Sequence, residues 1–333
     1  MKKNYFIGID VSKRKLDVAI YGKKGKLKEN HLVIQNELTG FENLINWLKS
    51  KNISSSYVFI CMEYTGLYSF EFQFFLEKMN ICYCMESGLR IKKSLGITRG
   101  KDDIIDAFRI AEYCYEKREN LVPTVMPSNE IFALRRLISE RKRYIQILAK
   151  QKVIAKEIAK YESEIAQKRT IETIGFIEKK ITEIEDDLLK TININSSIKQ
   201  NYDLLTSIKG IGFVNAINTI VYTNNFTTFS SPREYACYIG VAPFPNRSGS
   251  SIHGSTSVSK LGNINLKAEL TQAALTASRW DAGLKNYFNR KMKEKGGGSH
   301  NYGIVLNAVK FKLICRMFAV IKRQTPYIEL SFN

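Results

Sequence analysis

The order of β-forming and amphipathic helical runs in the first third of the chain limits the possible folds more than any other feature. Three β-forming runs come first, separated by short turns, which predicts a three-stranded antiparallel meander. Amphipathic helices and further apolar strands then alternate, a pattern that indicates an α/β domain built on one sheet. We predict strands at residues 4–11, 15–22, 27–34, 57–62 and 81–85, and helices at residues 41–48 and 67–78.

A predicted helix start at residues 99–107 carries three carboxylates beside basic residues. Gly100 is predicted to form the turn and Asp102 the N-cap, with its side chain directed away from the other two acids. Asp103 and Asp106 share one helical face, with Cβ atoms about 5–6 Å apart, near enough to bind one divalent metal or to flank two. On its own this pattern is more typical of a capped helix whose acidic first turn favours the helix dipole.

Two further carboxylates stand where predicted strands leave the sheet. Asp10 ends the first strand and Glu63 follows the fourth. Because this topology can bring the strand ends and the helix start to one sheet edge, we expect these two acids to cluster with Asp103 and Asp106. Carboxylate oxygens are ligands that suit Mg²⁺ and Mn²⁺. The four acids therefore predict a metal site for phosphoryl transfer, on an α/β fold of the ribonuclease H pattern.

The chain of 333 residues is strongly basic, with 51 Lys and Arg against 32 Asp and Glu, a formal charge of +19 and a pI near 9.5. Such an excess is expected of a protein that follows a phosphate backbone, so nucleic acid is the predicted partner. No apolar run reaches about 18 residues and no signal-peptide core is visible, which predicts a cytoplasmic chain with no membrane partner. Six scattered cysteines, without a Cys-x-x-Cys pair, indicate neither a zinc site nor a disulfide framework.

Long charged and aliphatic helical sequence occupies residues 128–200. Apolar residues recur at steps of three and four, which predicts helical packing seams. Arg141 and Lys152 interrupt the first seam, so we expect two antiparallel helices or a dimer contact in place of one uniform coiled coil. The many basic residues are typical of a solvated face, and their density also suits a phosphate-binding surface. The two seams are Ile131, Leu134, Ile138, Ile145 and Leu148, and Ile174, Ile177, Ile181, Ile184 and Leu188.

The last third of the chain contains two segments rich in small residues. Residues 204–216 predict a helix, a Gly-x-Gly turn and a second helix, which is either a phosphate-binding helix-hairpin-helix element or a tight helix–helix turn. Residues 246–251 are rich in Ser and Gly, and composition alone predicts a flexible loop there. A closing amphipathic helix is predicted at residues 304–321.

Three motifs resemble those of the DEDD transposases of the insertion-sequence-110 type. They are Gly8-Ile9-Asp10-Val11-Ser12-Lys13, Met62-Glu63-Tyr64-Thr65-Gly66 and Lys101-Asp102-Asp103-Ile104-Ile105-Asp106-Ala107. Asp102 stands where Thr is usual in that family, while Asp103 and Asp106 keep their spacing. The resemblance extends over nearly the whole chain and implies a ribonuclease H-like catalytic domain in which the acids bind metal.

The same resemblance implies a nucleophile and a set of partners. The nucleophile is a serine just before a glycine in a second conserved domain; Ser248 matches that position, with Ser250 and Ser251 as alternatives. The implied reaction passes through a phosphoserine link to DNA, and a structured bridge RNA from the same element selects donor and target DNA by base pairing. We accordingly expect a homodimer or tetramer. The expected domains are a ribonuclease H-like domain at 1–122, a helical coiled-coil spacer or dimerisation region at 123–200, and a mostly α transposase domain at 201–333.

Two other classes of function fit part of this pattern. A Holliday-junction-resolving nuclease would use the same acids with water as the nucleophile, which would make Ser248 dispensable. A non-catalytic scaffold for nucleic acid would need only the basic charge. A protein–DNA adduct that resists denaturation would distinguish the recombinase from both.

Overall fold

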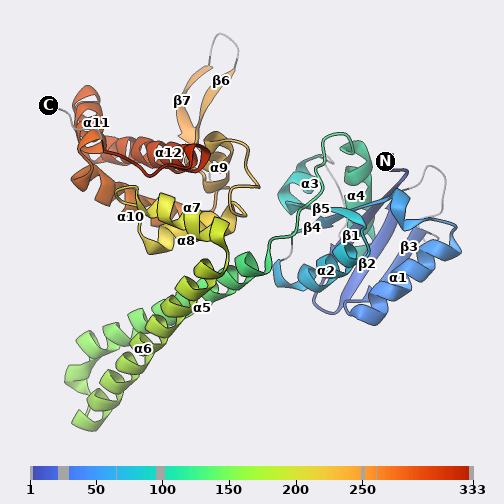
Figure 1. Cartoon of the computed structure of the whole chain (residues 1–333), viewed down its shortest axis with the longest axis horizontal. Coiled ribbons are helices and arrows are strands. Elements are labelled where there is room, and N and C mark those ends of the chain that lie inside the picture. Colours follow the sequence, from blue (N-terminus) through green and yellow to red (C-terminus); the bar gives the residue numbers. More distant parts are fainter. Residues whose placement is uncertain are drawn as a thin grey trace. The chain divides into compact units, whose positions relative to one another are not determined.

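The chain forms two compact units, Met1–Met126 and Pro127–Asn333. The computed structural model describes residues 3–21, 30–64, 66–94, 102–248, 252–259 and 261–329. The first unit is α/β and the second is mostly helical, as the sequence predicts (Figure 1). None of the helices in these ranges is both long and apolar enough to span a bilayer.

The first unit contains a five-stranded sheet with the order β3-β2-β1-β4-β5. β1, β2 and β3 are antiparallel neighbours, whereas β4 runs parallel to β1 and β5 parallel to β4. The predicted meander and the two later strands are therefore confirmed, although residues 22–29, which include the start of the predicted third strand, lie outside the described ranges. The strands are β1 Tyr5–Val11, β2 Lys15–Tyr21, β3 His31–Gln35, β4 Val58–Glu63 and β5 Cys82–Glu86, and the helices are α1 Leu38–Ser50, α2 Phe70–Lys78, α3 Gly88–Ser94 and α4 Asp103–Glu116.

Alternate strand residues face opposite sides of this sheet. Ile7 and Ile60 belong to the core that packs under α1 and α2. Phe6 and its neighbours on the other face pack against α3 and α4. Because the period is two, Asp10 and Glu63 lie on the α4 face of their strands, the face that also carries Phe6.

Gly8 lets α4 lie directly against β1. A Cβ atom at this position would come within 2.1 Å of the Ala111 amide nitrogen and 2.3 Å of the Ala107 carbonyl oxygen. Ala19, Ala107 and Ala111 are fully buried along the same seam. Small residues on both sides therefore bring the helix backbone close to the strand that carries Asp10.

The second unit begins with a helical hairpin, α5 Asn129–Val153 and α6 Glu164–Ile194, whose helices lie side by side and antiparallel (Figure 1). The two basic residues that interrupt the first seam pair across this hairpin. Arg141 Nη2 lies 2.6 Å from Glu185 Oε1, and Lys152 Nζ lies 2.8 Å from Glu178 Oε1. Two antiparallel helices, one of the arrangements that the sequence predicted, are therefore present within the chain.

A helix–turn–helix follows, as predicted, and its turn depends on Gly210. This residue has φ +96°, a left-handed conformation that favours glycine, and a Cβ atom here would lie 2.6 Å from the Ala273 carbonyl oxygen. The closing helix begins at Ser299, earlier than predicted. The remaining elements are α7 Ser196–Thr206, α8 Phe213–Tyr222, α9 Pro232–Ile239, α10 Ile264–Trp280, α11 Ala282–Glu294, α12 Ser299–Arg323, β6 Pro243–Ser248 and β7 Ile252–Val258.

The Ser/Gly-rich segment departs from the loop that its composition predicts. Residues 246–248 continue β6, which pairs antiparallel with β7, and Figure 1 shows this two-stranded ribbon standing out from the helices of its unit. The composition of residues 246–251 does not indicate strands, because the β-branched residues that favour β7, Ile252 and Val258, lie after this segment. Ser248 ends β6 opposite Ile252, while Ser250 and Ser251 lie outside the described residues.

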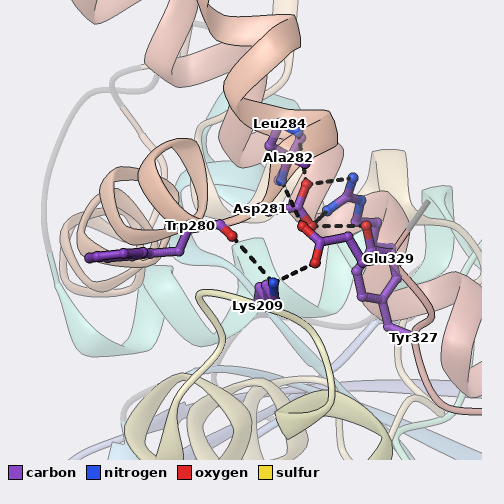
Figure 2. A network of polar contacts seen from close by, with 8 residues as sticks. Lys209, Trp280, Asp281, Ala282, Leu284, Tyr327 and Glu329 are labelled. Atoms are coloured by element: carbon purple, nitrogen blue, oxygen red, sulfur yellow. Dashed lines mark hydrogen bonds and ion pairs between the residues drawn. The ribbon is translucent and has the colours of Figure 1, made fainter. Parts of the chain in front are cut away.

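A polar network fixes the C-terminal tail to the helices of the second unit (Figure 2). The fully buried Asp281 caps α11 and accepts hydrogen bonds from Arg316 Nη1 at 2.8 Å and from the Tyr327 hydroxyl at 2.9 Å. Glu329 pairs with Lys209 in the turn between α7 and α8. The tail therefore ties the α10–α11 junction to the Gly-x-Gly turn.

Candidate active site

The four predicted acids come from three elements of the first unit. Asp10 lies in β1, Glu63 is the last residue of β4, and Asp103 and Asp106 occupy the first turn of α4. Asp102 is the N-cap of α4, because its Oδ1 accepts the N–H of Ile104 at 3.4 Å. The predicted cap is thus confirmed, whereas Gly100 and Lys101 lie outside the described residues.

Electrostatics shows that these acids share one neighbourhood. Burial raises the pKa of Asp10 from 3.8 to about 6, with further contributions from the charges of Asp103, Asp106, Glu63 and Asp17. A carboxyl group with this many negative neighbours is harder to ionise, because each neighbouring negative charge repels the charge that ionisation would create. The end of the sheet is therefore a region of concentrated negative charge.

The sequence did not single out Asp17, which lies directly opposite Asp10 in the antiparallel β1–β2 pair. Asp17 is only 2% exposed, and its carboxylate contacts Lys15 Nζ at 3.0 Å and His31 Nε2 at 3.1 Å. No local signal marked Asp17, because it alternates with apolar residues as a solvent-facing residue would, and its pairing with Asp10 depends on the β1–β2 register.

Basic residues of the chain contact both α4 acids. Lys15 Nζ lies 2.8 Å from Asp103 Oδ2, and Arg109 Nη1 lies 2.8 Å from Asp106 Oδ1. The hydrogen bonds to Asp103 and then to Asp17 raise the pKa of Lys15 above its usual range, so it is fully charged.

These donors suit a hard divalent cation. All four predicted ligands offer carboxylate oxygens. Burial, and after it the charges of the neighbouring acids, raises the pKa of Asp10, and a bound cation would favour its ionised form. Within the described residues, no three His, Cys, Asp or Glu side chains are yet gathered closely enough to hold a metal ion. Two of the candidate ligands, Asp103 and Asp106, are instead engaged by Lys15 and Arg109.

Gly88, at the start of α3, makes room for Glu63. A Cβ atom on Gly88 would lie 2.0 Å from Glu63 Oε1 and 2.4 Å from its Cδ. The Glu63 carboxylate therefore occupies the space that any other residue at position 88 would fill.

We expect Gly88→Ala to displace the Glu63 carboxylate without unfolding the chain, because the atoms that must shift are the far end of a flexible side chain. DNA cleavage should fall by about tenfold or more, since a ligand carboxylate moved by about an ångström is poorly placed. Cleavage rates and urea midpoints of the variant and the parent measure this. Unchanged cleavage in a folded Gly88→Ala chain would remove Glu63 from the site.

Ser248 belongs to the second unit. The structure describes its backbone as the last residue of β6, paired with Ile252 of β7. His253, in β7, is opposite Arg247 in the same register.

Comparison with known proteins assigns this chain to a family. A family model described as "Transposase", for DEDD transposases of the IS110 type, matches residues 7–158, which contain all four acids. A second, "Transposase IS116/IS110/IS902 family", matches residues 202–289, which contain Ser248. The chain belongs to the IS110 family of transposases. Like its family, this transposase is a DNA recombination enzyme. Metal dependence is typical of the family.

Known relatives cover the whole chain or part of it. Pilin gene-inverting proteins of Moraxella bovis and Moraxella lacunata are each 26% identical to this transposase over 332 residues, which is 98% of both chains. An uncharacterised 43.6 kDa protein of insertion element IS110 from Streptomyces coelicolor is 29% identical over 124 residues, 37% of this chain and 29% of that protein.

Proposed function

We propose that this transposase cuts and rejoins DNA through a covalent phosphoserine intermediate. In this proposal Asp10, Glu63, Asp103 and Asp106 hold Mg²⁺ or Mn²⁺, and Ser248 is the nucleophile. The observation that carries it is the placement of the acids: Asp10 and Glu63 lie on the face of the parallel strands β1 and β4 that α4 covers, and the other two acids begin α4. A ribonuclease H-like fold for the first unit is supported by its three antiparallel strands, followed by two parallel ones in the order β3-β2-β1-β4-β5.

The bonds exchanged in this reaction balance without any hydrolysis. The Ser248 hydroxyl loses its proton and its oxygen bonds to phosphorus, while the bond from phosphorus to the leaving deoxyribose oxygen breaks and that oxygen takes up a proton. A second DNA hydroxyl reverses the exchange and restores the serine. A serine hydroxyl is a weak nucleophile near neutral pH, and a bound divalent ion supplies both its activation and the neutralisation of phosphate charge.

We further propose that the transposase binds donor DNA, target DNA and a bridge RNA encoded by its element. The formal charge of +19 supports binding to several phosphate backbones at once. Base pairing by the RNA would then choose the DNA sites, and the protein would not need to recognise the DNA sequence itself.

An adduct assay tests the reaction. We expect wild-type chain, element DNA, its flanking RNA and Mg²⁺ to give a protein–DNA adduct that resists denaturation, and Ser248→Ala to give none. Cleaved DNA without an adduct would favour the Holliday-junction-type nuclease, and binding without cleavage the non-catalytic scaffold. Because the full-length relatives are named for gene inversion, the DNA should include paired sites in inverted orientation on one molecule as well as sites on two molecules.

The proposed domains are the ribonuclease H-like part at 1–122, the helical spacer at 123–200 as a coiled-coil dimerisation region, and the transposase part at 201–333. The active site would combine the acids of one chain with Ser248 of another in a dimer or tetramer. We expect a mixture of Asp10→Asn chains and Ser248→Ala chains to recover recombination that neither shows alone. Mixed dimers that form but recover nothing would contradict the shared site.

A further inference from the structure

Lys15 links two carboxylates from different elements at the edge of the candidate metal site. Its Nζ lies 3.0 Å from Asp17 Oδ2 in its own strand and 2.8 Å from Asp103 Oδ2 in α4. The motifs that identify the family do not include Lys15 or Asp17.

The two contacts of Lys15 differ in their surroundings. The Asp17 side chain is 3% exposed and also contacts His31, so this end of the bridge is fixed. The Asp103 side chain is 52% exposed and that of Lys15 is 41% exposed. Ion pairs in water contribute little and are easily exchanged, whereas a buried carboxylate retains its cation strongly. The bond to Asp103 is therefore the one that can break.

We propose that Lys15 is a counter-cation that competes with the divalent metal for Asp103. Its ammonium group donates to the Asp103 carboxylate in the arrangement observed, and it would remain on Asp17 when Asp103 binds the metal. This inference rests on the proposed function, because it takes Asp103 as a metal ligand.

Removing this competitor should strengthen metal binding. A unit positive charge several ångströms from a divalent ion opposes binding even through a dielectric close to that of water, and the expected gain in affinity on its removal is about tenfold. Lys15→Gln removes the charge and keeps an amide that can donate to Asp17. Lys15→Arg keeps the charge and should bind metal within about twofold of wild type.

The test measures the affinity of the full-length, metal-free chain for Mn²⁺ by the electron paramagnetic resonance signal of free Mn²⁺. Lys13→Gln is the matched control, since Lys13 is exposed, two residues away and carries the same charge. We expect about tenfold tighter binding for Lys15→Gln and less than about twofold change for Lys13→Gln. The Mn²⁺ binding that Asp10→Asn weakens is the binding at the proposed metal site. Urea midpoints verify that each variant folds.

The outcomes separate this inference from the proposed function. If wild-type chain shows no Mn²⁺ binding that Asp10→Asn weakens, the proposed metal site itself is wrong. If that binding is present but Lys15→Gln equals Lys13→Gln or binds Mn²⁺ more weakly than wild type, Lys15 is not a competitor. Should Lys15→Gln fail to fold, Lys15→Met, a neutral side chain of similar length, takes its place. Tighter Mn²⁺ binding than by Lys13→Gln supports the inference, and equal or weaker binding overturns it.

Discussion

Replacing Asp10 with asparagine is expected to lower DNA strand cleavage by about a thousandfold or more, and at the same time to stabilise the metal-free fold at pH 7. The loss of cleavage follows from the proposed role of Asp10 as a metal ligand, because asparagine offers a neutral oxygen in place of a carboxylate. The gain in stability follows because the same position concentrates like charges. A residue retained for folding alone would show the opposite change in stability.

The stability gain has a defined dependence on pH. Asp10 has a pKa of about 6 in the folded chain and about 3.9 when unfolded, so the folded state binds more protons between these values. The stability of the wild-type chain should therefore fall as the pH rises from about 4 to about 6. Asp10→Asn lacks this contribution and should be about 1–2 kcal/mol more stable at pH 7, a figure reduced for partial exposure to solvent.

Urea unfolding from about pH 4 to pH 7 without divalent metal, together with cleavage assays in Mg²⁺, measures both effects. Asp102→Asn is a matched control: it makes the same chemical change at the N-cap of α4, an acid that is not a predicted ligand, and asparagine caps helices as well as aspartate does. The control should keep both cleavage and stability. Near wild-type cleavage by Asp10→Asn would contradict the assignment of the acids.

Gly8→Ala is expected to destabilise the first unit by about 3 kcal/mol or more. The new methyl group would meet backbone atoms of Ala107 and Ala111 at 2.1–2.3 Å, and a helix backbone cannot move aside as a side chain can. α4 would have to separate from β1, which would also separate Asp103 and Asp106 from Asp10.

Gly175→Ala provides the comparison for this prediction. Gly175 lies inside α6, and a Cβ atom there meets nothing within 4 Å, so alanine should stabilise that helix by about 0.5–1 kcal/mol. Denaturant unfolding followed by circular dichroism measures both variants. If Gly8→Ala unfolded at the same denaturant concentration as the parent, the close seam between α4 and β1 would be wrong.

Much of the first unit could be predicted from local sequence. The strands and helices follow the periodicity of apolar residues, and the Asp102 cap follows from residue type and position. Asp10 and Glu63 were found because acids at strand ends are conspicuous. In the second unit the α6 seam was visible for the same reason, whereas the α5 seam holds only in part, because Ile131 and Leu134 are buried and Ile145 is 38% exposed. The basic residues that interrupt the α5 seam bridge the hairpin.

The remaining features of the site depend on which residues pair between distant segments of the chain, and local sequence patterns do not predict that pairing. The pairing of Asp17 with Asp10 depends on the β1–β2 register, and the contact of Lys15 with Asp103 joins residues 88 positions apart. The fit of Gly88 against Glu63 depends on where α3 begins relative to the end of β4. The β6–β7 ribbon was missed because its strands pair across a segment whose composition favours a loop.

Peptide mapping of the trapped adduct tests the central claim most directly. Wild-type transposase would be incubated with element DNA, its flanking RNA and Mg²⁺, denatured, digested with nuclease and protease, and analysed by mass spectrometry for a nucleotide-bearing peptide. We predict one modified residue, Ser248, and no modified peptide from Asp10→Asn. Cleaved DNA with no modified peptide, or a modification on Ser250, Ser251 or any other residue, would contradict the account.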